Sequence, residues 1–168
     1  EVKDNAIVYP LIRPYIYASV KNDKETNMLV YNIIEPKLND MEKQLLEKLK
    51  EGLIQVIDIN VEDIKEEGKV LDFIEGYTAK LLSDYGADLK EQEYVKIMYY
   101  IYRDFIGLNK IEPLLRDPYI EDIACDGVGI PIYIVHQKYG SLKTDIIYED
   151  ENEFVITAEM PGVAGGRA

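Results

Sequence analysis

The chain has 168 residues, of which 47% are hydrophobic and 30% charged, a composition typical of a folded globular protein and not of a disordered one. Its formal net charge of −13 argues against direct binding to nucleic acid or to anionic lipid, because both favour basic surfaces. The single cysteine, Cys125, excludes an internal disulfide and fits a reducing cytoplasm. Since the chain contains only one cysteine and one histidine, it offers too few ligands for a zinc site, and no metal is expected.

The chain begins with a predicted antiparallel hairpin. Residues 7–20 alternate in part between apolar and polar side chains, but two prolines interrupt them, which predicts an edge or irregular strand. Residues 28–34 predict a second strand, and the polar segment KNDKETN between the two predicts their loop.

A helix is expected directly after the hairpin. Asn39 and Glu42 have the spacing of a capping box, and leucines follow at helical spacing. Gly52 is placed at the C-terminal end of this helix, and the apolar run 54–59 is interpreted as a short strand. The acidic, polar stretch 60–69 is expected to separate an N-terminal lobe, residues 1–60, from the rest of the chain.

Two longer helices and a short one are predicted in the middle of the chain. Apolar side chains at helical spacing predict a helix over residues 70–86 and a second over 92–106, which Gly107 ends. A short helix over 111–116 has Pro113 in its first turn, where proline is tolerated.

Three short strands, residues 119–125, 132–136 and 142–148, predict an antiparallel meander after the helices. The expected fold is therefore α+β: an N-terminal hairpin and helix, then about three helices packed on the meander, with residues 61–151 as the second domain. Residues 152–168 end in small, Gly-rich sequence and are expected to be a flexible or non-native tail.

Residues 107–146 read GLNKIEPLLRDPYIEDIACDGVGIPIYIVHQKYGSLKTDI. This run resembles the segment just before the ATP-binding domain of the type II/type IV secretion ATPases, which has the pattern PLL-x-DP-x-(I/V)-EDI-x-x-(D/N)G and continues through (V/I)Y(V/I)-x-H to G-x-(I/L)-x-T. The similarity extends over residues 94–149, and the looser N-terminal match, VYPLIRPYIYASVKND with LVYNIIEPKL, favours the archaellum (archaeal flagellum) motor ATPases.

The resemblance implies the N-terminal regulatory and docking domain of a cytoplasmic hexamer, peripheral to the inner face of the cell membrane. Its parent protein would bind ATP and magnesium in a domain after residue 150, contact a membrane platform protein, and power archaellum assembly and rotation. Three alternatives stay open: the same domain of an archaeal pilus or protein-secretion ATPase, a free-standing adaptor without ATPase activity, and a chaperone-like protein on the likeness of FVITAEMPGV to a small heat-shock protein strand.

No G-x-x-x-x-G-K-[ST] loop occurs in the chain, so it is not expected to hydrolyse ATP alone, and no cofactor is predicted for it. The two glycines of DGVGIP lie between predicted strands, where a turn explains them. No catalytic residue is predicted, since the adjacent carboxylates of Glu121 and Asp122 face opposite sides of a strand.

Cations are outnumbered in this acidic chain, and the resembling run carries Arg116, His136, Lys138 and Lys143 among its cations. The resemblance implies that they face nucleotide in the assembled parent. Where the resembling ATPases carry arginine, this chain has lysine at position 143. A guanidinium binds phosphate through two parallel hydrogen bonds and an ammonium group does not, so the resemblance alone does not decide whether Lys143 contacts phosphate. The alternative is a set of surface charges that balance nearby carboxylates.

Fourteen tyrosines and no tryptophan are unusual, and tyrosine is enriched at protein interfaces. The candidates for an interaction surface are Tyr15, Tyr17, Tyr31, Tyr99 and Tyr100. The alternative, packing between the helices and the meander, is favoured for Tyr94 and Tyr102. The exposed edge of the N-terminal hairpin is also expected to accept a strand from a partner.

Overall fold

A computed structural model describes residues 6–60, 67–150 and 163–165. It shows the predicted α+β fold, divided into two compact units. The sheet unit comprises residues 1–36 and 110–168, and the helical unit comprises residues 37–109. The predicted domains 1–60 and 61–151 cut across this division, and most of the tail expected after residue 151 lies outside the described residues.

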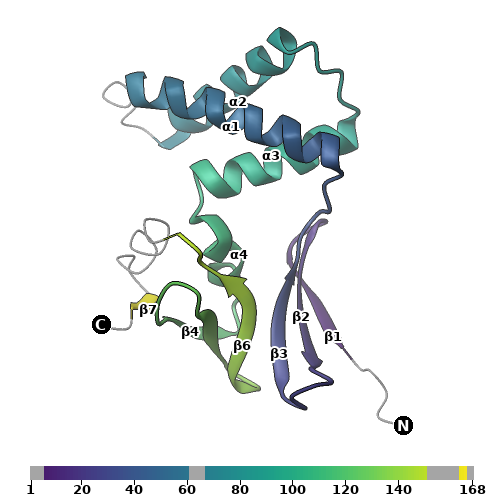
Figure 1. Cartoon of the computed structure of the whole chain (residues 1–168), viewed down its shortest axis with the longest axis vertical. Coiled ribbons are helices and arrows are strands. Elements are labelled where there is room, and N and C mark those ends of the chain that lie inside the picture. The colour runs from purple at the N-terminus through teal and green to yellow at the C-terminus, as the bar shows by residue number, and fades with distance from the viewer. Residues whose placement is uncertain (1–5, 61–66, 151–162, 166–168) are drawn as a thin grey trace. The chain divides into compact units, whose positions relative to one another are not determined.

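The sheet unit is built on one mixed sheet of seven strands in the order β1-β2-β3-β6-β5-β4-β7 (Figure 1). The 3-10 helix η1 and the short helix α4 precede β4 in the chain. The elements are β1 (Ile7–Ile12), β2 (Ile16–Asn22), β3 (Leu29–Ile34), η1 (Asn109–Ile111), α4 (Glu112–Leu115), β4 (Ile120–Cys125), β5 (Pro131–His136), β6 (Gly140–Ile147) and β7 (Val163–Gly165).

The predicted meander is confirmed, since β4, β5 and β6 pair antiparallel. The sequence pattern did not predict that β6 also pairs with β3, in parallel, so that the hairpin and the meander share one sheet. Val30 is opposite Lys143 and Tyr31 is opposite Thr144 in this pair. Partners more than a hundred residues apart leave no local pattern in the sequence.

The single irregular strand expected over residues 7–20 is two strands, β1 and β2, which turn at the Arg13–Pro14 peptide. The register of their pairing shifts between Pro10 and Ile12. The expected edge position is confirmed, because β1 is the first strand of the sheet. Proline has no backbone N–H to donate, and an edge strand tolerates this because one of its sides has no neighbouring strand.

The two faces of the sheet differ in burial. Alternate residues of the inner strands form the core of the sheet unit, which consists of Ile16, Ala18, Val20, Tyr31, Ile123, Ile132, Ile134 and Leu142 together with Ile111 and Leu114. The opposite face, here called the open face, carries Lys21, Val30, Lys143 and Tyr133, which lie opposite one another in register across four strands. The side chains of Lys21, Lys143 and Tyr133 are exposed on the open face.

The helical unit contains α1 (Asp40–Asn60), α2 (Glu67–Asp84) and α3 (Glu91–Phe105). Its core is a cluster of side chains from all three helices, among which Leu49, Leu53, Ile97 and Ile101 are fully buried. Gly86, at a φ of +63°, follows the end of α2 as predicted. Among the described residues, no helix combines the length and the hydropathy needed to cross a membrane.

The prediction of a strand over residues 54–59 is wrong, because α1 continues through this run to Asn60. Gly52 does not end the helix either. A Cβ atom at position 52 would lie 2.8 Å from Cδ1 of Leu81, so the glycine lets α2 approach α1 closely. The apolar run satisfies the helical period as well as a strand pattern, and short runs do not distinguish the two.

The capping box at the start of α1 is confirmed. The backbone N–H of Glu42 donates to Asn39 Oδ1 at 2.8 Å, and the N–H of Asn39 donates to Glu42 Oε2 at 2.7 Å. Glu42 also forms an ion pair with Lys96 of α3. Burial acts to raise the pKa of Glu42, but the hydrogen bonds from Lys96 and from the Asn39 N–H outweigh it and hold that pKa below its usual range.

Replacing Asn39 with alanine removes one half of this cap and is expected to lower the free energy of unfolding by about 1 kcal/mol. Urea unfolding followed by circular dichroism at 222 nm measures the loss. Gln44→Ala is the matched control, because Gln44 is exposed on the same helix and caps nothing. Equal stability of the two variants would contradict the role assigned to the cap.

Candidate functional site

Asp117, in the turn before β4, is the centre of a buried polar cluster. The residue is 4% exposed. Its Oδ2 accepts hydrogen bonds from the hydroxyls of Tyr9, at 2.5 Å, and Tyr31, at 2.7 Å. Its Oδ1 accepts the backbone N–H of Tyr119 at 2.9 Å. Burial, and then the hydrogen bond to Asp117, raise the pKa of both phenols well above the usual range, so both remain protonated donors.

His136, at the end of β5, extends this cluster by one hydrogen bond. Its Nδ1 accepts the backbone N–H of Lys138 at 3.1 Å, so the other ring nitrogen carries the proton. Nε2 then donates to the Tyr9 hydroxyl, 3.2 Å away, and Tyr9 donates onward to Asp117. The result is a directional chain of hydrogen bonds from the β5–β6 turn to the carboxylate.

Tyrosine rings surround His136 and account for its 4% exposure. Tyr119 stacks on the imidazole at a centroid distance of 5.9 Å, Tyr139 lies at 4.9 Å, and Tyr9 meets it edge-on at 6.4 Å. Tyr9 belongs to β1 and His136 to β5, which are not neighbours in the sheet order. The cluster therefore joins the first strand of the sheet to the meander.

The structure does not bring the four predicted cations to one place. His136 is buried, with both ring nitrogens engaged, so it does not present an atom to a phosphate in this unit. Arg116 is exposed and its Nε donates to Glu112 Oε1 at 2.7 Å. Lys138 lies over the ring of Tyr139, with Nζ 5.4 Å from the centroid. Lys143 is three registered positions from the turn, roughly 10 Å along β6.

The tyrosines predicted at a surface divide into three groups. Tyr15 is 43% exposed, as expected, and Tyr17, Tyr99 and Tyr100 are partly buried. The expectation for Tyr31 is wrong: its side chain is fully buried and its hydroxyl is bonded to Asp117. The alternation of a strand places neighbouring residues on opposite faces, and nothing local shows which face is the core.

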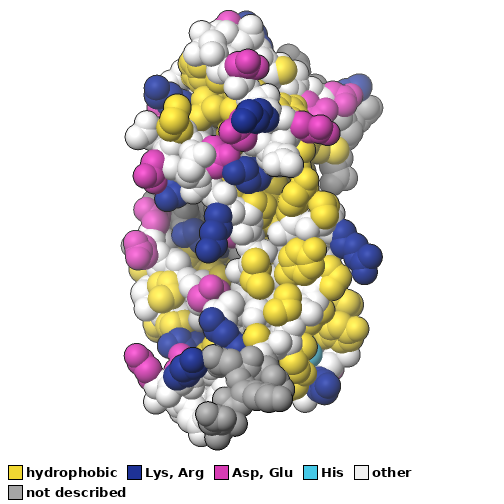
Figure 2. Space-filling view, turned by 90° about the vertical axis from the view of Figure 1, so that its right-hand side faces the viewer, with side chains coloured by type: hydrophobic (Ala, Val, Ile, Leu, Met, Phe, Trp, Pro, Cys, Tyr) yellow, Lys and Arg dark blue, Asp and Glu magenta, His cyan; other side chains and the backbone are white. Residues whose placement is uncertain are grey.

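A groove of about 610 Å³ opens on the open face of the sheet unit. Its lining includes Lys21 of β2, Val30 and Asn32 of β3, Lys143 and Asp145 of β6, and Tyr133 of β5. Figure 2 shows hydrophobic side chains gathered beside lysine and arginine side chains on the part of the surface formed by the sheet unit. Of the predicted site residues, Lys143 is the one that lines this groove.

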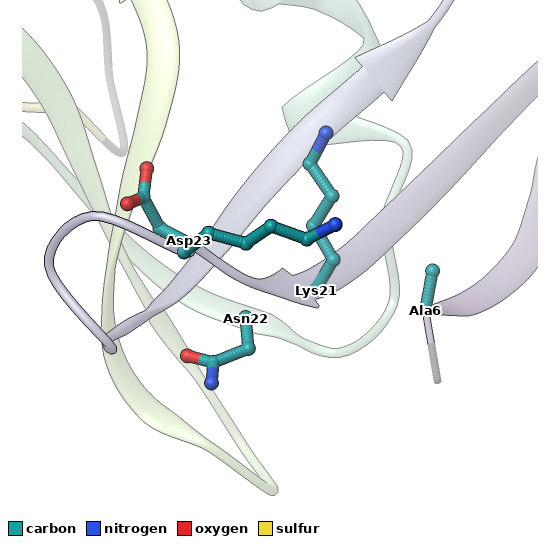
Figure 3. Close-up of a pocket in the computed structure, with 5 residues that line it drawn as sticks. Ala6, Lys21, Asn22 and Asp23 are labelled. Atoms are coloured by element: carbon teal, nitrogen blue, oxygen red, sulfur yellow. The ribbon is translucent and has the colours of Figure 1, made fainter. Parts of the chain in front are cut away.

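A second hollow, of about 430 Å³, adjoins the β2–β3 turn and shares Lys21 and Asp23 with the groove. In Figure 3 the ammonium group of Lys21 and the carboxylate of Asp23 point in different directions. The backbone N–H groups of Glu25 and Thr26 each donate to Asp23 Oδ1 at 2.9 Å, so this carboxylate closes its own turn. These bonds hold the pKa of Asp23 below its usual range.

Cys125 is a buried residue of β4 and is 2% exposed. Burial, and to a lesser extent the negative charge of the neighbouring Asp126, raises the pKa of its thiol to about 11. We expect a thiol reagent such as DTNB to modify the folded chain at pH 8 at least about 100-fold more slowly than the chain in urea. The folded state keeps the thiol proton longer than the unfolded state, so the free energy of unfolding should fall as pH rises from about 9 to about 11. Equal rates in the two states would contradict this placement.

The chain is similar to two proteins of the archaeon Methanocaldococcus jannaschii. The uncharacterized protein MJ1288 is 36% identical over 123 residues, which are 73% of this chain and 48% of that protein. The uncharacterized protein MJ0900 is 31% identical over 99% of this chain and 33% of its own length. The chain thus spans about half and about a third of the length of these relatives. No protein-family model matches it.

Proposed function

We propose that the chain is the N-terminal regulatory and docking domain of a hexameric ATPase of the type II/type IV secretion superfamily, and that its parent powers archaellum assembly and rotation. The observation that carries the proposal is the run 107–146, whose DP pair contributes the buried Asp117. In the structure this run is one continuous piece, α4 followed by the meander, joined to β1 and β3 through Tyr9 and Tyr31. Both archaeal relatives extend beyond the matched region, which leaves room for a hydrolysing domain.

In this proposal the roles of the cations differ. Lys138 and Lys143 are exposed and are the residues offered to nucleotide in the assembled hexamer, with Arg116 released from Glu112 as a further candidate. His136 acts through position: its Nδ1 holds the backbone of Lys138 and so orients the β5–β6 turn. ATP and magnesium belong to the parent protein, and this chain supplies charge at the edge of their site.

The same proposal places the domain beside the membrane. A net charge of −13 favours docking to basic cytoplasmic loops of a membrane platform protein, because complementary potentials raise the rate and specificity of association. The partners are then the platform protein, the parent's own ATPase domain and the neighbouring subunits. The location is the cytoplasm at the inner face of the cell membrane.

The experiment compares the complete product of the gene with a product that lacks residues 1–150. We expect the complete product to form a hexamer with magnesium and a nonhydrolysable ATP analogue and to hydrolyse ATP, and the shortened product to hydrolyse it at least several-fold more slowly. A complete product without ATPase activity would refute the proposal and leave the free-standing adaptor. Equal activity of the two products would refute a regulatory role.

The isolated chain offers a separate check. Because a ligand that binds only the folded state raises its stability, a chain without a nucleotide loop should show no more than about 1 °C of change in Tm with millimolar ATP and magnesium. A clear rise in Tm would show that these 168 residues bind nucleotide by themselves.

A further inference from the structure

The groove on the open face has an ordered arrangement of charges and apolar side chains. Lys21, Val30, Lys143 and Tyr133 are opposite one another across β2, β3, β6 and β5. Since neighbouring strands are about 4.8 Å apart, the two lysines are separated by about 10 Å at Cα, with Val30 between them. Both long side chains can therefore approach one group placed above Val30.

The donors of the groove have no close partner among the described residues, although Lys143 attracts Asp23 and Lys21 attracts Asp145 over a longer distance. Neither Lys21 nor Lys143 forms an ion pair with any residue in the described part of the structure. Nδ2 of Asn32, two residues beyond Val30 on β3, is buried and has no hydrogen-bond partner among the described residues. A buried amide without a partner costs free energy, so the site favours an occupant that supplies an acceptor.

The two carboxylates that line the groove are partly engaged by backbone N–H groups. Asp23 accepts two backbone N–H groups of its own turn. Partial desolvation raises the pKa of Asp145, although its carboxylate accepts a backbone hydrogen bond from Ile33. Among the described residues, the two lysines and the amide of Asn32 thus have no close partner, whereas each of the two carboxylates of the groove accepts backbone N–H groups.

We propose that this groove binds an extended peptide segment of a partner protein, with an acidic side chain flanked by apolar residues. The carboxylate lies between the ammonium groups of Lys21 and Lys143, and a backbone carbonyl of the peptide accepts Nδ2–H of Asn32. The flanking apolar side chains cover Tyr133, which is 38% exposed, and Ile147, which is 39% exposed. An inorganic phosphate or a nucleotide phosphate alone would leave these apolar walls in water.

The inference does not depend on the proposed function, since the groove is complete within the sheet unit; it assigns Lys143 to the peptide and leaves Lys138 and Arg116 as the residues that would face nucleotide. The test uses three pools of fluorescein-labelled 12-residue peptides, with glutamate, glutamine or lysine fixed at the centre and apolar residues enriched beside it. Fluorescence anisotropy measures binding to the 168-residue chain. We expect the glutamate pool to bind at least about tenfold more tightly than the glutamine pool and the lysine pool not to bind. Equal binding of the glutamate and glutamine pools, or no binding of any pool, would overturn the proposal.

Variants locate the site. Lys21→Ala and Lys143→Ala should each weaken binding of the glutamate pool at least about fivefold, and Asn32→Ala should weaken both the glutamate and the glutamine pools. Lys48→Ala is the matched control, because Lys48 is exposed on α1 in the helical unit and the change in net charge is the same. Circular dichroism confirms that each variant is folded. If Lys48→Ala weakened binding as much as Lys143→Ala, the effect would be one of net charge only. If millimolar ATP displaced the peptides, the groove would be assigned to nucleotide. Either result would overturn the proposal.

Discussion

Asparagine in place of Asp117 is expected to lower the free energy of unfolding of the chain by about 2–4 kcal/mol. The carboxylate accepts the hydroxyls of Tyr9 and Tyr31 on one oxygen and the N–H of Tyr119 on the other. An amide has one oxygen only, so in either orientation its NH2 group faces a donor. At 4% exposure, water does not compensate for the lost acceptor.

Equilibrium unfolding in urea, followed by tyrosine fluorescence, measures this change. Asp122→Asn is the matched control: it alters the same charge five residues along the chain, on an exposed side chain, and should change stability by less than about 0.5 kcal/mol. Tyr31→Phe provides a second test, because it removes one donor and leaves the ring in the core. If Asp117→Asn were as stable as Asp122→Asn, the hydrogen-bond chain from His136 to Asp117 would not hold the sheet unit together.

Leu53→Ala should destabilise the helical unit by about 2–5 kcal/mol, the range for deleting a buried leucine side chain. Leu53 is fully buried in the cluster formed by α1, α2 and α3. The loss combines the transfer free energy of the removed atoms with the cavity left between tightly packed helices. Hydrogen exchange of the amides of α1 and α3 measures the loss in this unit separately from the sheet unit.

The adjacent residue supplies the control. Ile54 is 52% exposed, so Ile54→Ala should cost less than about 1 kcal/mol although both changes remove a branched aliphatic side chain. In a strand starting at residue 54, as the sequence indicated, the two positions would have no reason to differ in this way. Similar losses for Leu53→Ala and Ile54→Ala would contradict the continuation of α1 to Asn60.

Local signals in the sequence were sufficient where the structure depends on neighbours in the chain. The Asn39–Glu42 pair identified the start of α1, and Gly86 identified the end of α2, because a cap involves residues a few positions apart. The three strands of the meander were also found, since each connection between them is short. Residues 54–59 were misassigned because an apolar run of this length fits either period.

The features that could not be predicted from the sequence depend on contacts between segments that are far apart in the chain. The parallel pair of β3 with β6 brings Val30 next to Lys143, and no local pattern indicates it. The same pairing decides which face of β3 is buried, and so explains why Tyr31 is in the core although it was expected at a surface. Asp117 was assigned only to a turn, yet its partners Tyr9 and Tyr31 are 108 and 86 residues away.

The candidate site was predicted in part. Lys143 does line an open groove, but Lys21 and Asn32, which complete its set of unused donors, lie on the hairpin and were not singled out. The resemblance to the secretion ATPases implied that four cations, Arg116, His136, Lys138 and Lys143, face one nucleotide. Their separation results from the sheet: β5 ends at the cluster around His136, whereas Lys143 projects from the middle of β6.

The measurement that tests the central proposal most directly is to sequence the native gene past the codon for Asn152. The proposal predicts that the reading frame continues into a domain that contains a GxxxxGK[ST] loop, which supplies the phosphate-binding backbone and the lysine that this chain lacks. A frame that ends without such a loop would contradict an ATPase parent, and the groove between Lys21 and Lys143 would then be the main functional feature of an adaptor.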